Sequence, residues 1–460
     1  MGSSNKQLQP LPSSYRDPSG YVFEHGHEIY RQVNKSFQTN FERFHSSGLY
    51  DELVKAQLLI SHQVIAENLT GEENWYTTLK PEMVDVISYP YEWTFSMLKD
   101  AALLTLQLAL KALEHGMILK DASPYNIQFH KGRMVFIDSL SFEIYKEAEP
   151  WIAYRQFCES FVGPLALMHY TGLPLQNLFL AYPDGIPLAI VKSLLPFRSK
   201  LNLYLYLHVH LHASYSQKKA GQPQQVSISK QKLVNLLRSL ESLIRSFRFT
   251  RFENVWGNYY AEAETRSGYL EEKKAIISLW VNSVEDVQTV IDIGGNEGEF
   301  AKLVSKGKRR VICADGEHFS VDKLYNHVKE AGTSNLLPLS IDFSHPSPAI
   351  GVNNQERDSF YARANSDLAM ALALVHHLAI GKNISFDLIA KMCAALGRTL
   401  IIEFVTKEDE KALQLLRQKK DIYHWYTEEN FVAAFSTYFR LISKRPLSSS
   451  PRTLYLMERL

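Results

Sequence analysis

The chain has 460 residues, of which 45% are hydrophobic and 22% charged, so two or three domains could each bury an ordinary core. A formal net charge of +1 excludes a strong bulk attraction to nucleic acid or to an anionic membrane. Cys158, Cys313 and Cys393 are scattered along apolar stretches, which indicates reduced thiols in an intracellular protein rather than a disulfide framework or a zinc site.

Residues 1–19 are rich in serine and proline, and we expect a flexible tail there. They lack the apolar core of a secretory signal, and the sequence contains no apolar run long enough to span a membrane. The sequence therefore predicts a cytoplasmic protein without a membrane span. It contains no recognisable RNA- or DNA-binding module, so we expect no nucleic-acid partner.

Residues 20–215 combine a hairpin-like stretch, YVFEHGHEIYRQV, with amphipathic segments. Residues 100–116 show helical periodicity that ends at Gly116, a residue typical of helix ends. Two short strands, NIQFH and RMVFID, should follow, joined by a turn at Lys131–Gly132. Residues 150–215 are predicted to be mostly helical.

The segment LKDASPYNIQFHKGRMVFIDSLSF places Asp121, Asn126 and Asp138 around the predicted hairpin. Their order resembles the catalytic loop and metal-binding motif of protein-kinase-like and aminoglycoside-phosphotransferase-like folds, and residues 87–93 resemble a hinge between lobes. The resemblance implies that Asp121 positions an acceptor hydroxyl while Asn126 and Asp138 hold magnesium. It also implies an α+β kinase-like domain over residues 20–215, with a possible Mg-ATP site.

The N-terminal lobe of this kinase-like domain is expected to be reduced. Leu119 stands where these folds usually have histidine, and no glycine-rich phosphate loop precedes it. Arg31 or Lys35 could replace the strand lysine that contacts phosphates. Three interpretations remain open: an active small-molecule kinase, a nucleotide- or substrate-binding relic, and chance similarity.

Residues 216–231 are polar, contain glycine and proline, and lack periodicity, so we interpret them as a linker. A helical lead-in is expected over residues 232–287. From residue 288 to residue 460, strand-like and helix-like segments alternate, which predicts an α/β fold with a doubly wound and mainly parallel sheet.

The stretch VIDIGGNEGEF, residues 290–300, runs from a buried strand into a glycine turn. Gly294, Gly295 and Gly298 permit a tight turn and let a ligand approach the backbone. Asp315 ends the next predicted strand, where an acid can accept hydrogen bonds from ribose hydroxyls. The pairing predicts a nucleoside-containing cofactor. The alternative is an unrelated nucleotide-binding domain in which the glycines only shape a turn.

The order D-I-G-G-N-E-G resembles motif I of class I S-adenosylmethionine-dependent methyltransferases, with Asn296 in place of the middle glycine. The resemblance implies a Rossmann-like domain over residues 288–460 and S-adenosyl-L-methionine as cofactor. Asp342, after the third predicted strand, would lie beside the adenine. The cofactor-binding residues implied in this way are Asp292, Gly294, Gly295, Asn296, Gly298, Asp315 and Asp342.

His376 and His377 stand at the end of the fourth predicted strand, above the implied donor site. A hydroxyl acceptor benefits from a base, so either histidine is a candidate catalytic residue, and O-methylation is the expected reaction. The two rings are expected to point in different directions, so that at most one is catalytic. The alternative is that they pack against the loop.

His208, His210 and His212 form an H-x-H-x-H pattern. On a strand all three would share a face, whereas on a helix only His208 and His212 would. No carboxylate-rich segment accompanies them, so we expect no metal site.

Several segments together resemble a bacterial family of class I methyltransferases that is similar to the nodulation protein NoeA. The segments are ISYPYEW, LKDASPYNIQF, FIDSLSFEIY, PWIAYRQFC, the D-I-G-G-N-E-G turn, ALALVHHLAI, IIEFV and SPRTLYLMERL. This resemblance implies a methyltransferase that acts on a small-molecule or saccharide acceptor. The alternatives are a phosphotransferase centred on Asp121 and a non-catalytic scaffold that binds ligands.

Overall fold

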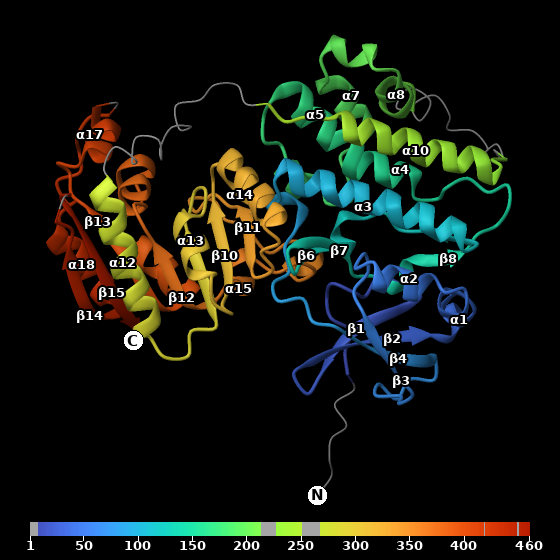
Figure 1. Cartoon of the computed structure of the whole chain (residues 1–460), viewed down its shortest axis with the longest axis horizontal. Coiled ribbons are helices and arrows are strands. Elements are labelled where there is room, and N and C mark those ends of the chain that lie inside the picture. Colours follow the sequence, from blue (N-terminus) through green and yellow to red (C-terminus); the bar gives the residue numbers. More distant parts are fainter. Residues whose placement is uncertain (1–7, 213–226, 251–266, 418, 449) are drawn as a thin grey trace, which may run out of the picture. The chain divides into compact units, whose positions relative to one another are not determined.

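The computed structural model describes residues 8–212, 227–250, 267–417, 419–448 and 450–460 (Figure 1). Two compact units make up the chain. Unit 1 comprises Met1–Arg251 together with Ala349–Asp358, and unit 2 comprises Phe252–Pro348 and Ser359–Leu460. Most of the expected linker lies outside the described residues. Its last residues begin helix α10 (Lys230–Ser246), which packs against α3 (Phe95–Glu114) in unit 1.

Unit 1 begins with a four-stranded antiparallel sheet in the order β1-β2-β4-β3. The predicted hairpin is confirmed: β1 (Gly20–His25) and β2 (Glu28–Asn34) turn at Gly26 and His27, which both have positive φ. The strands β3 (His62–Ile65) and β4 (Trp75–Pro81) complete the sheet. Helices α1 (Gln38–Ser46) and α2 (Leu49–Lys55) lie between β2 and β3 in the chain.

The predicted helix at residues 100–116 is α3, which begins five residues earlier, at Phe95. Thr94 caps it by accepting a hydrogen bond from the Met97 amide, and Gly116, with φ 70°, follows its last turn. The two expected short strands are β6 (Ile127–His130) and β7 (Arg133–Phe136). They form an antiparallel hairpin whose turn is Lys131–Gly132, as predicted. A second pair joins β5 (Met117–Leu119) to β8 (Phe142–Ile144).

Residues 150–212 are mainly helical, as expected. The helices are α4 (Tyr154–Phe157), η5 (Cys158–Val162), α5 (Gly163–Thr171), α6 (Leu178–Ala181), α7 (Leu188–Leu194), η6 (Phe197–Leu201), α8 (Leu203–Leu205) and η7 (Tyr206–Leu211).

The segment Ala349–Asp358 follows β11 of unit 2 in the chain but belongs to unit 1. The Glu356 carboxylate accepts hydrogen bonds from the Tyr15 hydroxyl at 2.7 Å and from Arg16 at 2.6 Å. The Arg357 guanidinium lies 3.7 Å from the ring centroid of Tyr125. The chain therefore enters unit 1 a second time.

Unit 2 contains a seven-stranded sheet in the order β11-β10-β9-β12-β13-β15-β14. Five strands are mutually parallel: β9 (Thr289–Ile293), β10 (Arg310–Asp315), β11 (Leu336–Ser340), β12 (Ser366–Ala371) and β13 (Gly397–Val405). β15 (Arg452–Arg459) runs antiparallel between β13 and the edge strand β14 (Phe439–Pro446). The predicted α/β fold and its mainly parallel sheet are confirmed.

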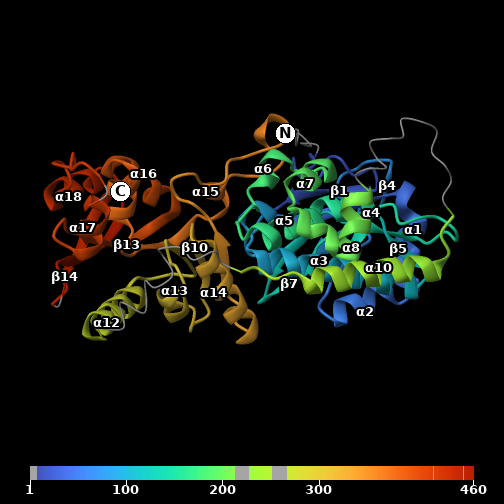
Figure 2. The ribbon, with the colours of Figure 1, turned by 90° about the horizontal axis from the view of Figure 1, so that it is seen from above.

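The helices of unit 2 connect and cover this sheet. Among the described residues they are, in chain order, α12 (Ser267–Ser283), α13 (Glu299–Val304), α14 (His318–Glu330), α15 (Phe360–Arg363), η9 (His377–Gly381), α16 (Phe386–Leu396), α17 (Glu410–Arg417) and α18 (Glu428–Ser436). α14 packs on β10 and β11, whereas α16 packs on β12 and β13 (Figure 2).

The strand order reverses at β9. From β9 the chain proceeds outward to β10 and β11, and it then returns to place β12 on the other side of β9. In open α/β sheets, ligands bind outside the carboxyl ends of the strands at such a switch point. The segments after β9 and β12 therefore frame the candidate site of unit 2.

Candidate functional site

The turn after β9 is built from the predicted glycines. Gly294 and Gly298 both have φ 74°, a conformation that favours glycine, and Gly298 precedes the first residue of α13. A Cβ atom on Gly295 would lie 2.5 Å from the Cys313 Sγ and 2.8 Å from the Asp292 Oδ2. Asn296 has φ 49°, a left-handed conformation that asparagine tolerates better than most residues.

Asp292 lies beneath the turn and is buried. Burial raises the pKa of its carboxyl to about 7, while nearby Lys273 acts in the opposite direction. Its Oδ2 atom has no hydrogen-bond partner among the described residues. Asp292 is therefore a buried carboxyl next to the turn, with a pKa near neutrality.

Asp315 ends β10 beside the turn, as predicted. Its Oδ2 accepts a hydrogen bond from the Asn296 amide at 2.9 Å, and its Oδ1 accepts one from the Glu317 amide at 2.7 Å. Burial raises the pKa of Asp315, and the two amides lower it. Each carboxylate oxygen has more than one lone pair, so both retain capacity for hydroxyl donors of a ligand.

Asp342 follows β11 and lies next to this site, because a Cβ on Gly316 would be 3.5 Å from its Cα. Its Oδ1 accepts hydrogen bonds from the Ser344 amide at 2.8 Å and from the Ser344 hydroxyl at 2.6 Å. Burial would raise the pKa of Asp342, but these hydrogen bonds, with Lys382 nearby, lower it. The structure therefore brings Asp342 near Asp315 and keeps it ionised.

His376 and His377 follow β12, on the other side of the switch point. Their rings do not point in different directions as expected, since they pack together with centroids 4.1 Å apart. His376 is fully buried, and neither of its ring nitrogens has a hydrogen-bond partner among the described residues. Burial lowers the pKa of both rings, that of His377 to about 4, and the nearby cations Arg452 and Lys411 lower it further.

A buried ionic network beside these histidines was not predicted. Lys273 of α12 lies 2.6 Å from the Glu403 carboxylate at the end of β13. Glu403 also accepts a 2.6 Å hydrogen bond from the Tyr269 hydroxyl, which in turn accepts one from Arg452. Arg452 pairs with Asp409 through two hydrogen bonds, of 2.8 and 3.0 Å.

The sequence held one signal for this network. Tyr269 and Lys273 are four residues apart, so they share a helix face. The run EEKK suggests a solvated surface, yet Lys273 within this run is only 3% exposed. Only the three-dimensional structure shows which of two adjacent lysines faces the core.

The predicted kinase-like residues also gather in unit 1. The Asp121 carboxylate accepts hydrogen bonds from the Asn126 side chain at 3.0 Å and from Gln156 at 2.7 Å. Burial, and then the proximity of Asp138, raise the pKa of Asp121. Of the two cations considered, Arg31 reaches the site and pairs with Asp138 at 2.6 Å.

Among the described residues, no group of three histidine, cysteine or acidic side chains is placed to hold a metal ion. The H-x-H-x-H residues lie on a helical segment, where His208 contacts the Tyr154 hydroxyl at 2.9 Å and that of Ser239 at 3.1 Å. His210 contacts the Ser199 hydroxyl at 2.9 Å. Within the described ranges, no helix is both long and apolar enough to cross a membrane.

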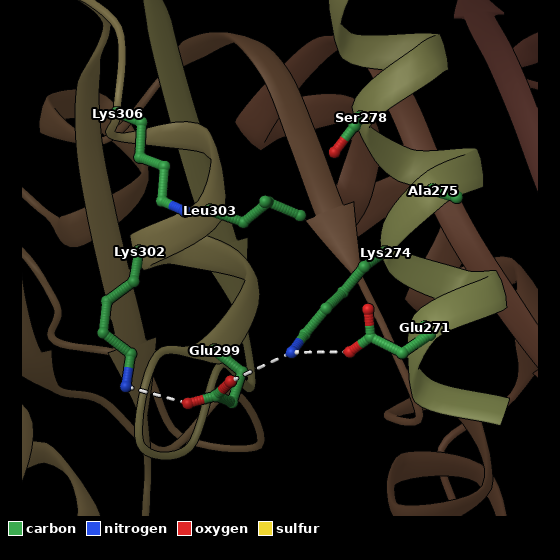
Figure 3. Close-up of a pocket in the computed structure, with 8 residues that line it drawn as sticks. All are labelled: Glu271, Lys274, Ala275, Ser278, Glu299, Lys302, Leu303 and Lys306. Carbon is green, nitrogen blue, oxygen red and sulfur yellow. Dashed lines mark hydrogen bonds and ion pairs between the residues drawn. The ribbon is translucent and has the colours of Figure 1, made fainter. Parts of the chain in front are cut away.

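Helices α12 and α13 frame a surface cavity of about 450 Å³ (Figure 3). Its lining residues are Glu271, Lys274, Ala275, Ser278, Glu299, Lys302, Leu303 and Lys306. Lys302 lies 2.9 Å from Glu299, and Lys274 lies 3.4 Å from Glu271. Neither the glycine turn nor the β12 exit contributes to it, so this cavity is separate from the candidate site.

No protein-family model matches the sequence. Among solved structures, the N-methyltransferase NodS from Bradyrhizobium japonicum WM9 is 12% identical with a TM-score of 0.31, covering 42% of this chain and 96% of that chain. The magnesium protoporphyrin IX methyltransferase ChlM from Synechocystis PCC 6803, with bound SAH, is 14% identical with a TM-score of 0.32, covering 45% and 90%. TM-scores this low do not establish a common fold.

The similarity to one curated protein is of a different order. Nodulation protein NoeA from Rhizobium meliloti (strain 1021) is 31% identical over 466 residues, which span 98% of this chain and 96% of that protein. Because the relation extends over nearly the full length of both chains, this protein belongs to the family of nodulation protein NoeA.

Proposed function

We propose that the protein is an S-adenosyl-L-methionine-dependent methyltransferase of a small-molecule acceptor, with its donor site at the switch point of unit 2. The observation that carries this proposal is the pairing of the glycine turn with Asp315. The turn presents backbone beside a carboxylate that two amides fix in place. A nucleoside with two free ribose hydroxyls matches that arrangement.

The residues around the turn fit the donor. Asp315 would bind the ribose, Asp342 would lie beside the adenine, and Gly294 with Asn296 would line the approach. The bound donor supplies a methyl group on a sulfonium, which is already an activated leaving group. The protein therefore needs mainly to align the acceptor and to exclude water.

We propose His377 as the base for an acceptor hydroxyl, and hence O-methylation, with a saccharide as one acceptor class. His376 is fully buried, whereas His377 is partly accessible, so His377 is the ring that an acceptor can reach. Its low pKa keeps the imidazole neutral near pH 7 and able to accept a proton, although it also makes the ring a weak base. His376 packs behind it and fixes its orientation.

Calorimetry with S-adenosyl-L-methionine and S-adenosylhomocysteine tests the donor site. We expect saturable binding that Asp315→Ala removes. Arg440→Ala is a control, because Arg440 lies on the edge strand β14, where it pairs with Glu458 and does not belong to the proposed donor site. Absence of binding to the wild-type protein, or binding that Asp315→Ala leaves unchanged, would contradict the proposal.

A second candidate function is phosphotransfer in unit 1, and the observation in its favour is the gathering of Asp121, Asn126 and Asp138. Asp138 is paired with Arg31 here, so magnesium would have to compete with, or act beside, that cation. Binding of Mg-ATP that Asp138→Ala abolishes, with turnover of the nucleotide, would support this function. If neither Mg-ATP nor the methyl donor binds, the scaffold interpretation is favoured.

A further inference from the structure

One segment of unit 1 exposes large apolar side chains at high density. Leu201 is 81% exposed, Phe197 is 75% exposed and Leu203 is 66% exposed. We call the following set the 194–207 patch: Leu194, Phe197, Leu201, Leu203, Tyr204, Tyr206 and Leu207. Seven such side chains within fourteen residues differ from the scattered apolar residues that are normal on protein surfaces.

The patch is part of the folded unit. Leu195, Ser199 and Leu205 between its exposed residues, and Val209 just after them, are buried and anchor the segment. η6 contacts both α8 and η7, and η7 contacts α7, so the short helices pack on one another. The exposed side chains therefore stand on a supported surface and are not free to collapse into the core.

The surrounding charge is entirely basic in sequence. Residues 185–240 contain no aspartate or glutamate, and Lys192, Arg198 and Lys200 lie within or beside the patch. The Lys200 Nζ lies 5.1 Å from the ring centroid of Phe197. The Arg198 guanidinium lies 5.6 Å from the ring of Tyr170 and donates a hydrogen bond to its carbonyl oxygen at 2.6 Å. The whole chain has a formal net charge of only +1, so its total charge does not reveal this local excess of positive charge.

We propose that the 194–207 patch binds the surface of an anionic lipid bilayer. Leucine and aromatic side chains beside lysine and arginine are the composition of interfacial segments, which insert apolar groups at the headgroup boundary while cations meet anionic lipids. Protein interfaces instead tend to be depleted in lysine. No described helix crosses a membrane, so attachment is peripheral.

Vesicle sedimentation of the full-length protein tests this assignment. One set of vesicles is phosphatidylcholine alone, and the other is phosphatidylcholine with phosphatidylglycerol in equal parts. We expect binding to the second set that weakens with added salt. Phe197→Ser/Leu201→Ser/Leu203→Ser should weaken binding by about 100-fold or more, since each inserted side chain contributes about fivefold or more.

Arg198→Gln/Lys200→Gln should weaken binding about 25-fold, because each cation near an anionic surface contributes about fivefold. Leu279→Ser/Leu388→Ser is the matched control, since these leucines are 63% and 59% exposed elsewhere in the chain and should leave binding unchanged. Circular dichroism of each variant checks that the fold is retained.

Three outcomes overturn the proposal. The first is equal binding to both kinds of vesicle. The second is loss of binding in the leucine control to the same extent as in the patch variants. The third is a wild-type oligomer that the serine variants dissociate while vesicle binding persists, which would assign the patch to an interface between copies of this chain.

Discussion

Replacing Lys273 with methionine tests how unit 2 holds helix α12 against β13. Lys273 is 3% exposed, and its ammonium lies 2.6 Å from the Glu403 carboxylate, which is fully buried. Burial lowers the pKa of Lys273, and Glu403 raises it. Methionine retains most of the side-chain volume, so the variant removes the charge rather than the packing.

The expected loss of stability follows from the partners that remain. Removing one member of a buried ion pair costs about 3–5 kcal/mol, because the other charge is left uncompensated. Glu403 would keep the Tyr269 hydrogen bond, and the Arg452 guanidinium would still lie 3.7 Å away. We therefore expect the lower end, about 3 kcal/mol. Lys274→Met, one residue along the same helix, removes two partly exposed ion pairs, with Glu271 and Glu299, and should cost less than about 1 kcal/mol.

The assay must report unit 2 separately, since two units need not unfold together. Cys313 and Cys393 are buried free thiols of unit 2, and Cys158 is one of unit 1. Thiol labelling in increasing urea, read by mass spectrometry of each cysteine peptide, gives the unfolding free energy of each unit. Equal losses in Lys273→Met and Lys274→Met, or a loss below about 1 kcal/mol in the former, would refute the reasoning.

Three further predictions concern the candidate site. Gly295→Ala should destabilise unit 2 by about 1–3 kcal/mol and abolish donor binding in calorimetry. The reason is that the added Cβ would lie 2.5 Å from the buried Cys313 Sγ. Gly307→Ala is the control: its added Cβ would have its nearest neighbour at 3.5 Å, so stability and donor binding should both stay unchanged. The pKa of Asp292 is about 7 in the folded protein and about 4 in the unfolded chain. The folded state therefore binds the proton more tightly, and its stability should fall as the pH rises from about 4 to about 7, by up to about 1.4 kcal/mol per pH unit. Urea unfolding of Asp292→Asn over that range should lack this contribution, and slopes equal to those of the wild type would contradict it. The ring of His377, whose pKa is about 4, should remain neutral down to about pH 5 in NMR titrations assigned with His377→Gln, and a midpoint near 6.5 would contradict its burial.

The sequence predicted best where local rules and burial agree. The sequence of the parallel strands β9, β10 and β13 consists of mainly apolar runs followed by turns or polar residues. The structure forms these strands where the sequence predicts them. The hairpin at Lys131–Gly132 follows directly from turn chemistry. The glycine turn is contiguous in sequence, so its glycines and Asp292 could be placed from the sequence alone.

What the sequence missed depends on contacts between distant residues. Strand β14 was not predicted, because only its first residue is buried and it shows no apolar alternation. It exists because its backbone pairs with β15. The Lys273–Glu403 pair and the Arg31–Asp138 pair each join residues more than a hundred positions apart, and no local pattern marks either partner.

The return of the chain to unit 1 at Ala349–Asp358 has a consequence for biosynthesis. Tyr15 and its partner Glu356 are separated by 341 residues, so a ribosome must translate a large part of unit 2 before unit 1 can be completed. Domains usually fold as the nascent chain emerges, the N-terminal one first. In this protein, unit 1 cannot complete its native contacts until residues 349–358 have been synthesised. Gene fragments cut between the two halves would each yield an incomplete product: one lacking its final segment, the other carrying that segment without its native contacts.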